Sequence, residues 1–278
     1  MDGRRGWGSG VVLAGAWMVL FFLVAPMFIV APISLTPERY LSWPRGGVSF
    51  QYYVNLVTNP VWLKAIGQSL FVAVTSTVLA VLVGTLCAVG CWRVGSRRSE
   101  LVRTLMLTPL IVPAIVHALG FYRVWIDLHL LDTFTGVILV HVVTSLPYVV
   151  ITVSAALANF DHRLEQAARN LGASMAQTVR MVIVPSIIPG ILAGAVFAFV
   201  HSWDEIVVLL FITSRRLYLL PRAMWDGINE AVDPTIAAVA TVLVLVTLTV
   251  LLVQRWLARR AAARERRVRV ARDALAAE

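Results

Sequence analysis

Lysine is almost absent from this sequence of 278 residues, which contains a single one, Lys64, in the stretch NPVWLKAIG. A phosphate-binding loop of the form G-x-x-x-x-G-K-[ST] needs a lysine directly after a glycine, so the chain cannot contain one. Any use of nucleotide energy by this protein must therefore involve another chain.

Cysteine is also scarce. The two residues present, Cys87 and Cys91, are too few for a small scaffold held together by disulfides. They stand four positions apart near the end of an apolar run and so share one helix face. This arrangement favours a packing role for both side chains.

Charged residues make up only 14% of the chain, whereas 59% is hydrophobic and the mean hydropathy is +0.81. This excess of apolar residues is too large for one soluble core and is typical of a polytopic membrane protein. The net charge of +9 could suggest a nucleic-acid partner. The basic residues, however, cluster at the ends of apolar runs, which indicates membrane orientation, so no nucleic acid is expected.

Six apolar runs are longer than the roughly 20 residues that a helix needs to cross a bilayer. We therefore predict an all-α polytopic membrane protein with six transmembrane helices over residues 11–256, preceded by a short segment 1–10 and followed by a basic tail 257–278. The first run is too long for a signal peptide and is expected to remain as a span. The predicted spans are 11–33, 67–92, 104–126, 134–158, 186–213 and 235–256.

The distribution of basic residues predicts that both termini lie in the cytoplasm. With the N-terminus inside, 17 of the 24 Lys and Arg residues fall on the inner side. The arginine-rich tail either rests on anionic lipid headgroups or is disordered. On the outer side, residues 214–234 are expected to form a short helix at the membrane surface, the alternative being a solvated loop.

A polar stretch, residues 159–185, separates the fourth and fifth runs. Asp161 is a good N-cap, Gly172 can end the helix, and Ser174 with Gln177 forms a capping box for a second one. The sequence therefore predicts helix, sharp turn and helix on the cytoplasmic side. The first helix has one apolar face, which favours a protein groove over the alternative of lipid because it is rich in alanine. Its positions are Leu164, Ala167, Ala168 and Leu171.

This stretch resembles the cytoplasmic loop motif of permease subunits in binding-protein-dependent ABC importers. That motif reads Glu-Ala-Ala, three residues, Gly, nine residues, then Ile-x-Leu-Pro. The chain departs from it at Gln166, where the family has Glu and where Glu165 stands one place earlier, and at two valines. The resemblance extends to most of the chain, including GQSLFVAVTSTVLAVLVGTLCAVG. The matching positions are Gln166, Ala167, Ala168, Gly172, Val182, Ile183, Val184 and Pro185.

The resemblance implies a type I ABC importer permease fold in the bacterial cytoplasmic (inner) membrane. It implies that residues 162–178 form a coupling helix, which docks in a groove of a cytoplasmic ATPase. The expected partners are two ATPase subunits that carry ATP and Mg, a homologous second permease, and a periplasmic or lipid-tethered solute-binding protein. This chain itself would then be no enzyme and hold no cofactor. The expected coupling residues are Glu165, Gln166, Ala167, Ala168, Leu171, Gly172, Ala173 and Pro185.

Two acids, Asp204 and Glu205 in HSWDEIVVLLFIT, fall in the middle to outer part of the fifth run. An ionised carboxylate there costs about 2.5–3.5 kcal/mol, so such residues face a cavity or a partner charge. Exposure to a water-filled route is favoured over an ion pair, for which Arg123 is the nearby candidate. Adjacent positions on one helix point about 100° apart, so at most one acid is expected to face the path directly.

The neighbouring Trp203 suggests which solute these acids meet, because carboxylates beside an aromatic ring suit an ammonium group. The segment also resembles spermidine/putrescine-type permeases, a likeness that LPRAMWDGINEAVDPTIAAVAT strengthens. We expect Trp203, Asp204 and Glu205 to line a path for a polyamine or related cationic amine. Another small solute, such as an opine or an amino-acid derivative, remains open. No metal site is expected, because His117, His141 and His201 lack ligand spacing and favour packing or interhelical hydrogen bonds.

Two other classes of protein are alternative interpretations of the same sequence. A secondary carrier driven by an ion gradient would use Asp204 or Glu205 as its ion site. Such carriers usually contain internal repeats, which we do not find here. A membrane enzyme would need clustered His, Asp or Ser near one face, and the sequence has no such cluster.

Overall fold

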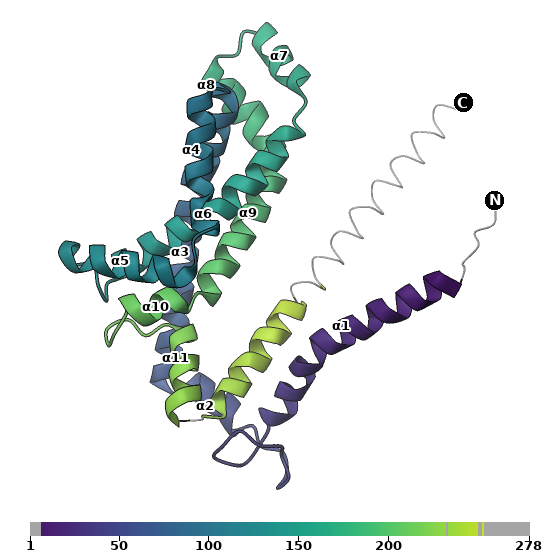
Figure 1. Ribbon diagram of the computed structural model, residues 1–278, viewed down its shortest axis with the longest axis vertical. Coiled ribbons are helices and arrows are strands. Elements are labelled where there is room, and N and C mark those ends of the chain that lie inside the picture. The colour runs from purple at the N-terminus through teal and green to yellow at the C-terminus, as the bar shows by residue number, and fades with distance from the viewer. Residues whose placement is uncertain (1–6, 232, 250–251, 253–278) are drawn as a thin grey trace. The chain divides into compact units, whose positions relative to one another are not determined.

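The computed structural model describes residues 7–231, 233–249 and 252, and every regular element in that part of the chain is a helix (Figure 1). The all-α prediction is therefore confirmed for the described residues. The segment 1–6 and the basic tail 257–278 lie outside them. The chain forms two compact units, of which one is Pro60–Asp226 and the other combines the segments on either side of it.

Three helices form the centre of the unit Pro60–Asp226. They are α3 (Pro60–Val94), α6 (Phe134–Ala158) and α9 (Val184–Asp204), and they pack against one another along much of their length (Figure 1). The apolar part of α6 is 67% buried, against 28% for α3. The core of this unit therefore lies around α6, and the outer faces of the other two helices are left for lipid or partner subunits.

Small residues let these helices approach closely. A Cβ atom placed on Gly84 of α3 would lie 2.8 Å from Cγ1 of Val149 on α6. One placed on Gly194 of α9 would lie 2.6 Å from Oγ1 of Thr152 on α6. Both distances are shorter than any normal contact, so only glycine fits at these positions. Close backbone approach through small residues is typical of helix packing in membranes.

The third apolar run, 104–126, does not form one straight helix. It is divided among α4 (Arg97–Leu107), the 3-10 turn η1 (Thr108–Leu110) and α5 (Ala114–Leu128), and the helices on either side of the break are bent by 102°. Pro113, directly before α5, has a non-helical backbone with ψ 140°. Proline lacks an N–H and restricts the residue before it, which explains the break.

The fifth run, 186–213, is also interrupted. A helical stretch from Met175 reaches Asp204 at the end of α9, and the chain then breaks before α10 (Val207–Ile212). At the break Glu205 is extended, with ψ 110°. Beyond α10, the predicted short helix of segment 214–234 is present as α11 (Leu220–Asp226).

The second unit contains α1 (Trp7–Ile33), α2 (Gln51–Thr58), the π-helical turn η3 (Gly227–Ala231) and the helix Thr235–Thr249. Its parts are joined by side chains, since Asn55 Nδ2 donates to Thr235 Oγ1 at 2.8 Å. None of the apolar window of α1 is buried. Such a surface needs a bilayer or another subunit to cover it.

Four described helices are long and apolar enough to cross a membrane, or five if the bent pair around η1 forms one span. The helix Thr235–Thr249 is shorter, and the predicted run 235–256 extends beyond the described residues. Six spans with both termini in the cytoplasm therefore remain a prediction.

Candidate functional site

The stretch between the fourth and fifth runs folds as helix, turn and helix, as its sequence predicts. Helix α7 (His162–Asn170) follows Asp161, whose side chain accepts a hydrogen bond of 2.9 Å from a backbone N–H in the first turn. Helix α8 (Met175–Thr178) follows Ser174, whose backbone N–H donates to Gln177 Oε1 at 2.8 Å. Local capping thus sets where both helices begin.

The turn between these helices depends on Gly172. Its φ is +85°, a left-handed conformation that side chains with a Cβ rarely adopt. Its N–H donates to the carbonyl of Arg169 at 3.0 Å, and the N–H of Ala173 donates to the carbonyl of Ala168 at 3.1 Å. This pair of bonds is the Schellman arrangement, which closes a helix and reverses the chain sharply.

An exposed surface runs along α7 and its turn, at one end of the α3–α6–α9 group (Figure 1). Leu171 is 88% exposed and Leu164 49% exposed. Gln166 and Ala167 are exposed beside them, whereas Ala168 and Ala173 are half-buried. Pro185 lies apart from this surface, in the first turn of α9.

Glu165 has a different environment from the other predicted coupling residues. Its Oε1 lies 2.5 Å from Nη2 of Arg93, in the last turn of α3, and the two side chains are 15% and 19% exposed. Next to this pair, Trp92 stacks on His162 with 5.2 Å between ring centroids. Glu165 therefore faces α3 and holds α7 against it. Nothing in the local sequence spacing links Arg93 or Trp92 to α7, so neither could be predicted to lie here.

Replacing Glu165 with Gln is expected to loosen α7 from α3, because a largely buried guanidinium loses its counter-charge. The cost should be about 1–3 kcal/mol, between the values for exposed and buried pairs. Amide hydrogen exchange along α7 should then become roughly tenfold faster.

The double variant Arg93→Glu with Glu165→Arg should restore slow exchange in α7. The matched control is Glu100→Gln, which removes an exposed acid paired with Arg103 at 3.3 Å and should leave α7 unchanged. Equal exchange in Glu165→Gln and the wild type would show that the ion pair does not hold this helix.

A second site lies at the far end of α9 from α7. A cavity of about 230 Å³ contains both predicted acids, Asp204 and Glu205, side by side in its lining. At most one of the two acids would face the path if Asp204 and Glu205 lay on one continuous helix. Because α9 ends at Asp204 and Glu205 is extended, both reach the same cavity. The lining consists of Tyr148, Phe197, Val200, His201, Asp204 and Glu205.

The cavity has an excess of negative charge. Within the described residues, neither carboxylate forms an ion pair with Arg or Lys, and the predicted candidate Arg123 pairs instead with Asp127 at 2.8 Å. Glu205 Oε1 accepts a hydrogen bond of 3.0 Å from the N–H of Val208 and so caps α10. The carboxyl end of α9 adds partial negative charge at the same place. The site is therefore suited to a cation.

His201 and Tyr148 also line the cavity, and neither is predicted from the sequence to belong to it. The ring of His201 lies 5.1 Å from that of Tyr148 between centroids, and its buried Nε2 has no hydrogen-bond partner in the described part of the chain. The spacing of His201 from the acids could have revealed it, whereas Tyr148 comes from α6. The predicted interhelical hydrogen bond is found at His141, whose Nδ1 lies 2.7 Å from Ser202 Oγ.

Trp203 does not line this cavity, although it was predicted to contact the same path. Its ring stacks on Phe199 of the same helix, with 5.8 Å between centroids and 18° between planes. Within the described residues, no group of three or more His, Cys, Asp or Glu side chains is placed to hold a metal ion.

The loop after α10 is held by Asp132, which lies between α5 and α6. Its carboxylate accepts hydrogen bonds from the backbone N–H groups of Ser214 at 2.9 Å, Arg216 at 2.9 Å and Leu217 at 3.0 Å. Burial raises the pKa of Asp132, but the backbone donors outweigh it, so the pKa lies below its usual 3.8. The charged form is therefore the one that orders this loop.

Replacing Asp132 with Asn should loosen the loop, because an amide accepts fewer hydrogen bonds and brings its own N–H donors against the backbone N–H groups. A loss of about 2 kcal/mol would speed exchange of the Arg216 and Leu217 amides roughly 30-fold. Since the folded pKa is depressed, protection in the wild type should be complete above pH 3.8 and disappear only as pH falls through the lower, folded value. Asp127→Asn, at an exposed ion pair, is the control. Unchanged amide exchange in Asp132→Asn would contradict this role.

Two comparisons of the sequence with known proteins agree on one family. Residues 80–263 match the family described as binding-protein-dependent transport system inner membrane component. The chain is 31% identical over 253 residues to the spermidine/putrescine transport system permease protein PotC of Escherichia coli K12, covering 90% of this chain and 95% of that protein. It is 28% identical over 248 residues to the putrescine transport system permease protein PotI of the same organism, covering 86% of each.

A solved structure shows the same fold. In a bacterial ABC transporter involved in the import of the acidic polysaccharide alginate, one chain aligns with a TM-score of 0.70. The alignment covers 92% of this chain and 98% of that one at 14% identity. At this identity, the likeness concerns the fold alone.

Proposed function

Because the chain belongs to the family of inner membrane components of binding-protein-dependent transport systems, we propose that this ABC importer permease carries small cationic amines of the putrescine or spermidine type. The observation that carries the choice of solute is the cavity containing Asp204 and Glu205. Inside a membrane, two ionised carboxylates without an Arg or Lys partner would be energetically unfavourable unless a cation binds to them. A diamine presents two ammonium groups, one for each carboxylate.

Transport would be driven from the exposed surface of α7. Two ATPase subunits, which bind ATP and Mg, would each dock on a coupling helix, one of them on Leu164, Ala167 and Leu171 of this chain. Leu171 and Leu164 are large apolar side chains whose exposure suits such a groove. A homologous second permease would complete the path, and a solute-binding protein would deliver the amine from outside. In this arrangement the chain would cross the membrane six times, with both termini in the cytoplasm.

Motion at α7 has two routes into this chain. One passes through the Glu165–Arg93 ion pair to α3. The other follows the chain through α8 and the π-helical turn η2 (Val179–Ile183) into α9, whose opposite end carries Asp204. Single π-helical turns are often found at functional sites. Movement of the ATPases would thus change the cavity by shifting the helix that bears its acids.

The test is transport by the complete purified complex in proteoliposomes, with labelled putrescine or spermidine. Uptake should require the binding protein and ATP, and ATPase subunits should copurify with the permease. Uptake driven by an ion gradient without ATPases would overturn the coupling mechanism. Preference of the associated binding protein for a neutral or anionic solute, such as an opine, would overturn the choice of amine.

A further inference from the structure

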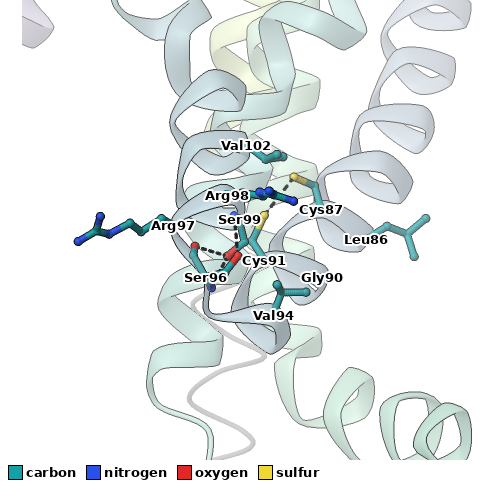
Figure 2. A pocket seen from close by; sticks show the side chains of 10 residues that line it. All are labelled: Leu86, Cys87, Gly90, Cys91, Val94, Ser96, Arg97, Arg98, Ser99 and Val102. Atoms are coloured by element: carbon teal, nitrogen blue, oxygen red, sulfur yellow. Dashed lines mark hydrogen bonds between the residues drawn. The ribbon is translucent and has the colours of Figure 1, made fainter.

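A larger groove, separate from the acidic cavity, lies where α3 ends and α4 begins (Figure 2). Its volume is about 830 Å³, within the range of about 300–1,000 Å³ typical of small-molecule sites. The part formed by α3 is apolar apart from two thiols, which lie 3.9 Å apart. The lining consists of Leu86, Cys87, Gly90, Cys91, Val94, Ser96, Arg97, Arg98, Ser99 and Val102.

Both positively charged residues of this groove belong to α4. Arg97 and Arg98 are exposed at the start of α4, and neither forms an ion pair within the described residues. The acid closest in sequence, Glu100, pairs with Arg103 at 3.3 Å. In Figure 2 the Arg98 side chain lies among the other lining side chains, whereas Arg97 extends away from them. Both cations therefore remain available to an anion from outside the chain.

The amino end of α4 adds to this charge. The capping box uses Ser96 Oγ to accept from the N–H of Ser99 at 3.2 Å, and Ser99 Oγ to accept from the N–H of Ser96 at 2.9 Å. The N–H groups of Arg97 and Arg98 are in the first helical turn, where the helix supplies no acceptor for them. A helix start with free N–H groups favours a bound anion such as phosphate.

The groove lies at the same end of the unit Pro60–Asp226 as α7, because Arg93 in the last turn of α3 contacts Glu165. Under the proposed function, on which this step rests, that end is cytoplasmic. The groove then crosses the inner boundary of the bilayer. Leu86 and Val94, which line it, are 73% and 67% exposed, as apolar residues in contact with lipid are.

We propose that this groove binds an anionic phospholipid of the inner leaflet. The phosphate lies at Arg98 and the first turn of α4, Arg97 adds positive charge beside it, and an acyl chain lies along α3 past Gly90. The match is one of charge and polarity together. The groove combines an apolar wall from α3 with two cations on α4, as a phospholipid combines apolar chains with an anionic head. A polar protein partner would leave the apolar length unmatched.

The test uses the complete transporter in vesicles of phosphatidylcholine containing a photoreactive phosphatidylglycerol. The yield of cross-links to residues 86–102 is measured by mass spectrometry. The double variant Arg97→Gln with Arg98→Gln should lower that yield about 25-fold at subsaturating lipid, since each basic residue contributes roughly fivefold. The matched control is Arg215→Gln with Arg216→Gln, an adjacent exposed pair elsewhere.

A second variant removes the acyl space without changing charge. A Cβ on Gly90 would meet nothing within 4 Å, so Gly90→Phe should fill the groove without disturbing the fold and should also abolish the cross-links. Excess inorganic phosphate should not compete, because it lacks the acyl chain.

Three results would overturn the proposal: cross-links unchanged in both variants, full competition by free phosphate, or loss of the second permease from the Gly90→Phe complex while the lipid cross-links persist. Amine uptake is measured on the same preparation. If cross-linking follows the variants but no amine is transported, the lipid site stands and only the proposed function fails.

Discussion

A transporter carrying Asp204→Asn together with Glu205→Gln is expected to take up putrescine at least tenfold more slowly than the wild type. Each replacement keeps the shape of the side chain and removes its charge from a cavity where neither acid pairs with Arg or Lys. A hydrogen bond to a charged group contributes about 1.5–3 kcal/mol, so loss of both should exceed a factor of 10 in kcat/KM. The measurement is ATP-dependent uptake in proteoliposomes at several amine concentrations.

Single variants at position 205 distinguish the effect of the carboxylate charge on uptake from its effect on the structure. Gln at position 205 keeps an oxygen that can accept from the N–H of Val208, so the cap of α10 persists and only charge is lost. Glu205→Ala removes the cap as well and should also lower thermal stability. ATPase activity stimulated by the binding protein should continue in the double variant, which shows that assembly is intact. Wild-type uptake by the double variant would mean that the acids are structural and that the solute is not selected by charge.

Gly172→Val is expected to abolish most uptake by a different route. Gly172 has a φ of +85°. In this conformation a residue with a Cβ is destabilised by about 1–2 kcal/mol, and a β-branched residue such as valine by more. No atom lies within 4 Å of the added Cβ, so the effect comes from backbone strain rather than collision. The turn after α7 should shift, and the exposed Leu171 surface should no longer fit the ATPase.

Substitution of the same glycine by asparagine provides the matched control, because asparagine tolerates the left-handed conformation far better than valine. Gly172→Asn should keep ATPase copurification and much of the uptake, while Gly172→Val loses both and still inserts into the membrane. Equal uptake in these two variants and the wild type would show that the shape of this turn is not needed for coupling.

Features set by neighbouring residues could be predicted from the sequence. The apolar runs predicted an all-helical membrane protein, because the bilayer requires about 20 apolar residues for a spanning helix. Asp161, Ser174 and Gly172 predicted α7, its turn and α8, and the structure contains all three with the expected caps. Helix caps and left-handed turns depend on residues within four or five positions, so their chemistry is visible in a single sequence.

Features that join distant segments were decided only by tertiary structure. Glu165 is predicted as one of the coupling residues, and the structure adds a contact with Arg93, 72 positions earlier, that the sequence does not reveal. The break at Glu205 brings two adjacent acids to one cavity, where Tyr148 of α6 also lies, while Trp203 is absent from the lining and stacks on Phe199. Such contacts depend on which helices pack together and where each one breaks. Local spacing carries no information on either, because the packing energy arises between segments rather than within them.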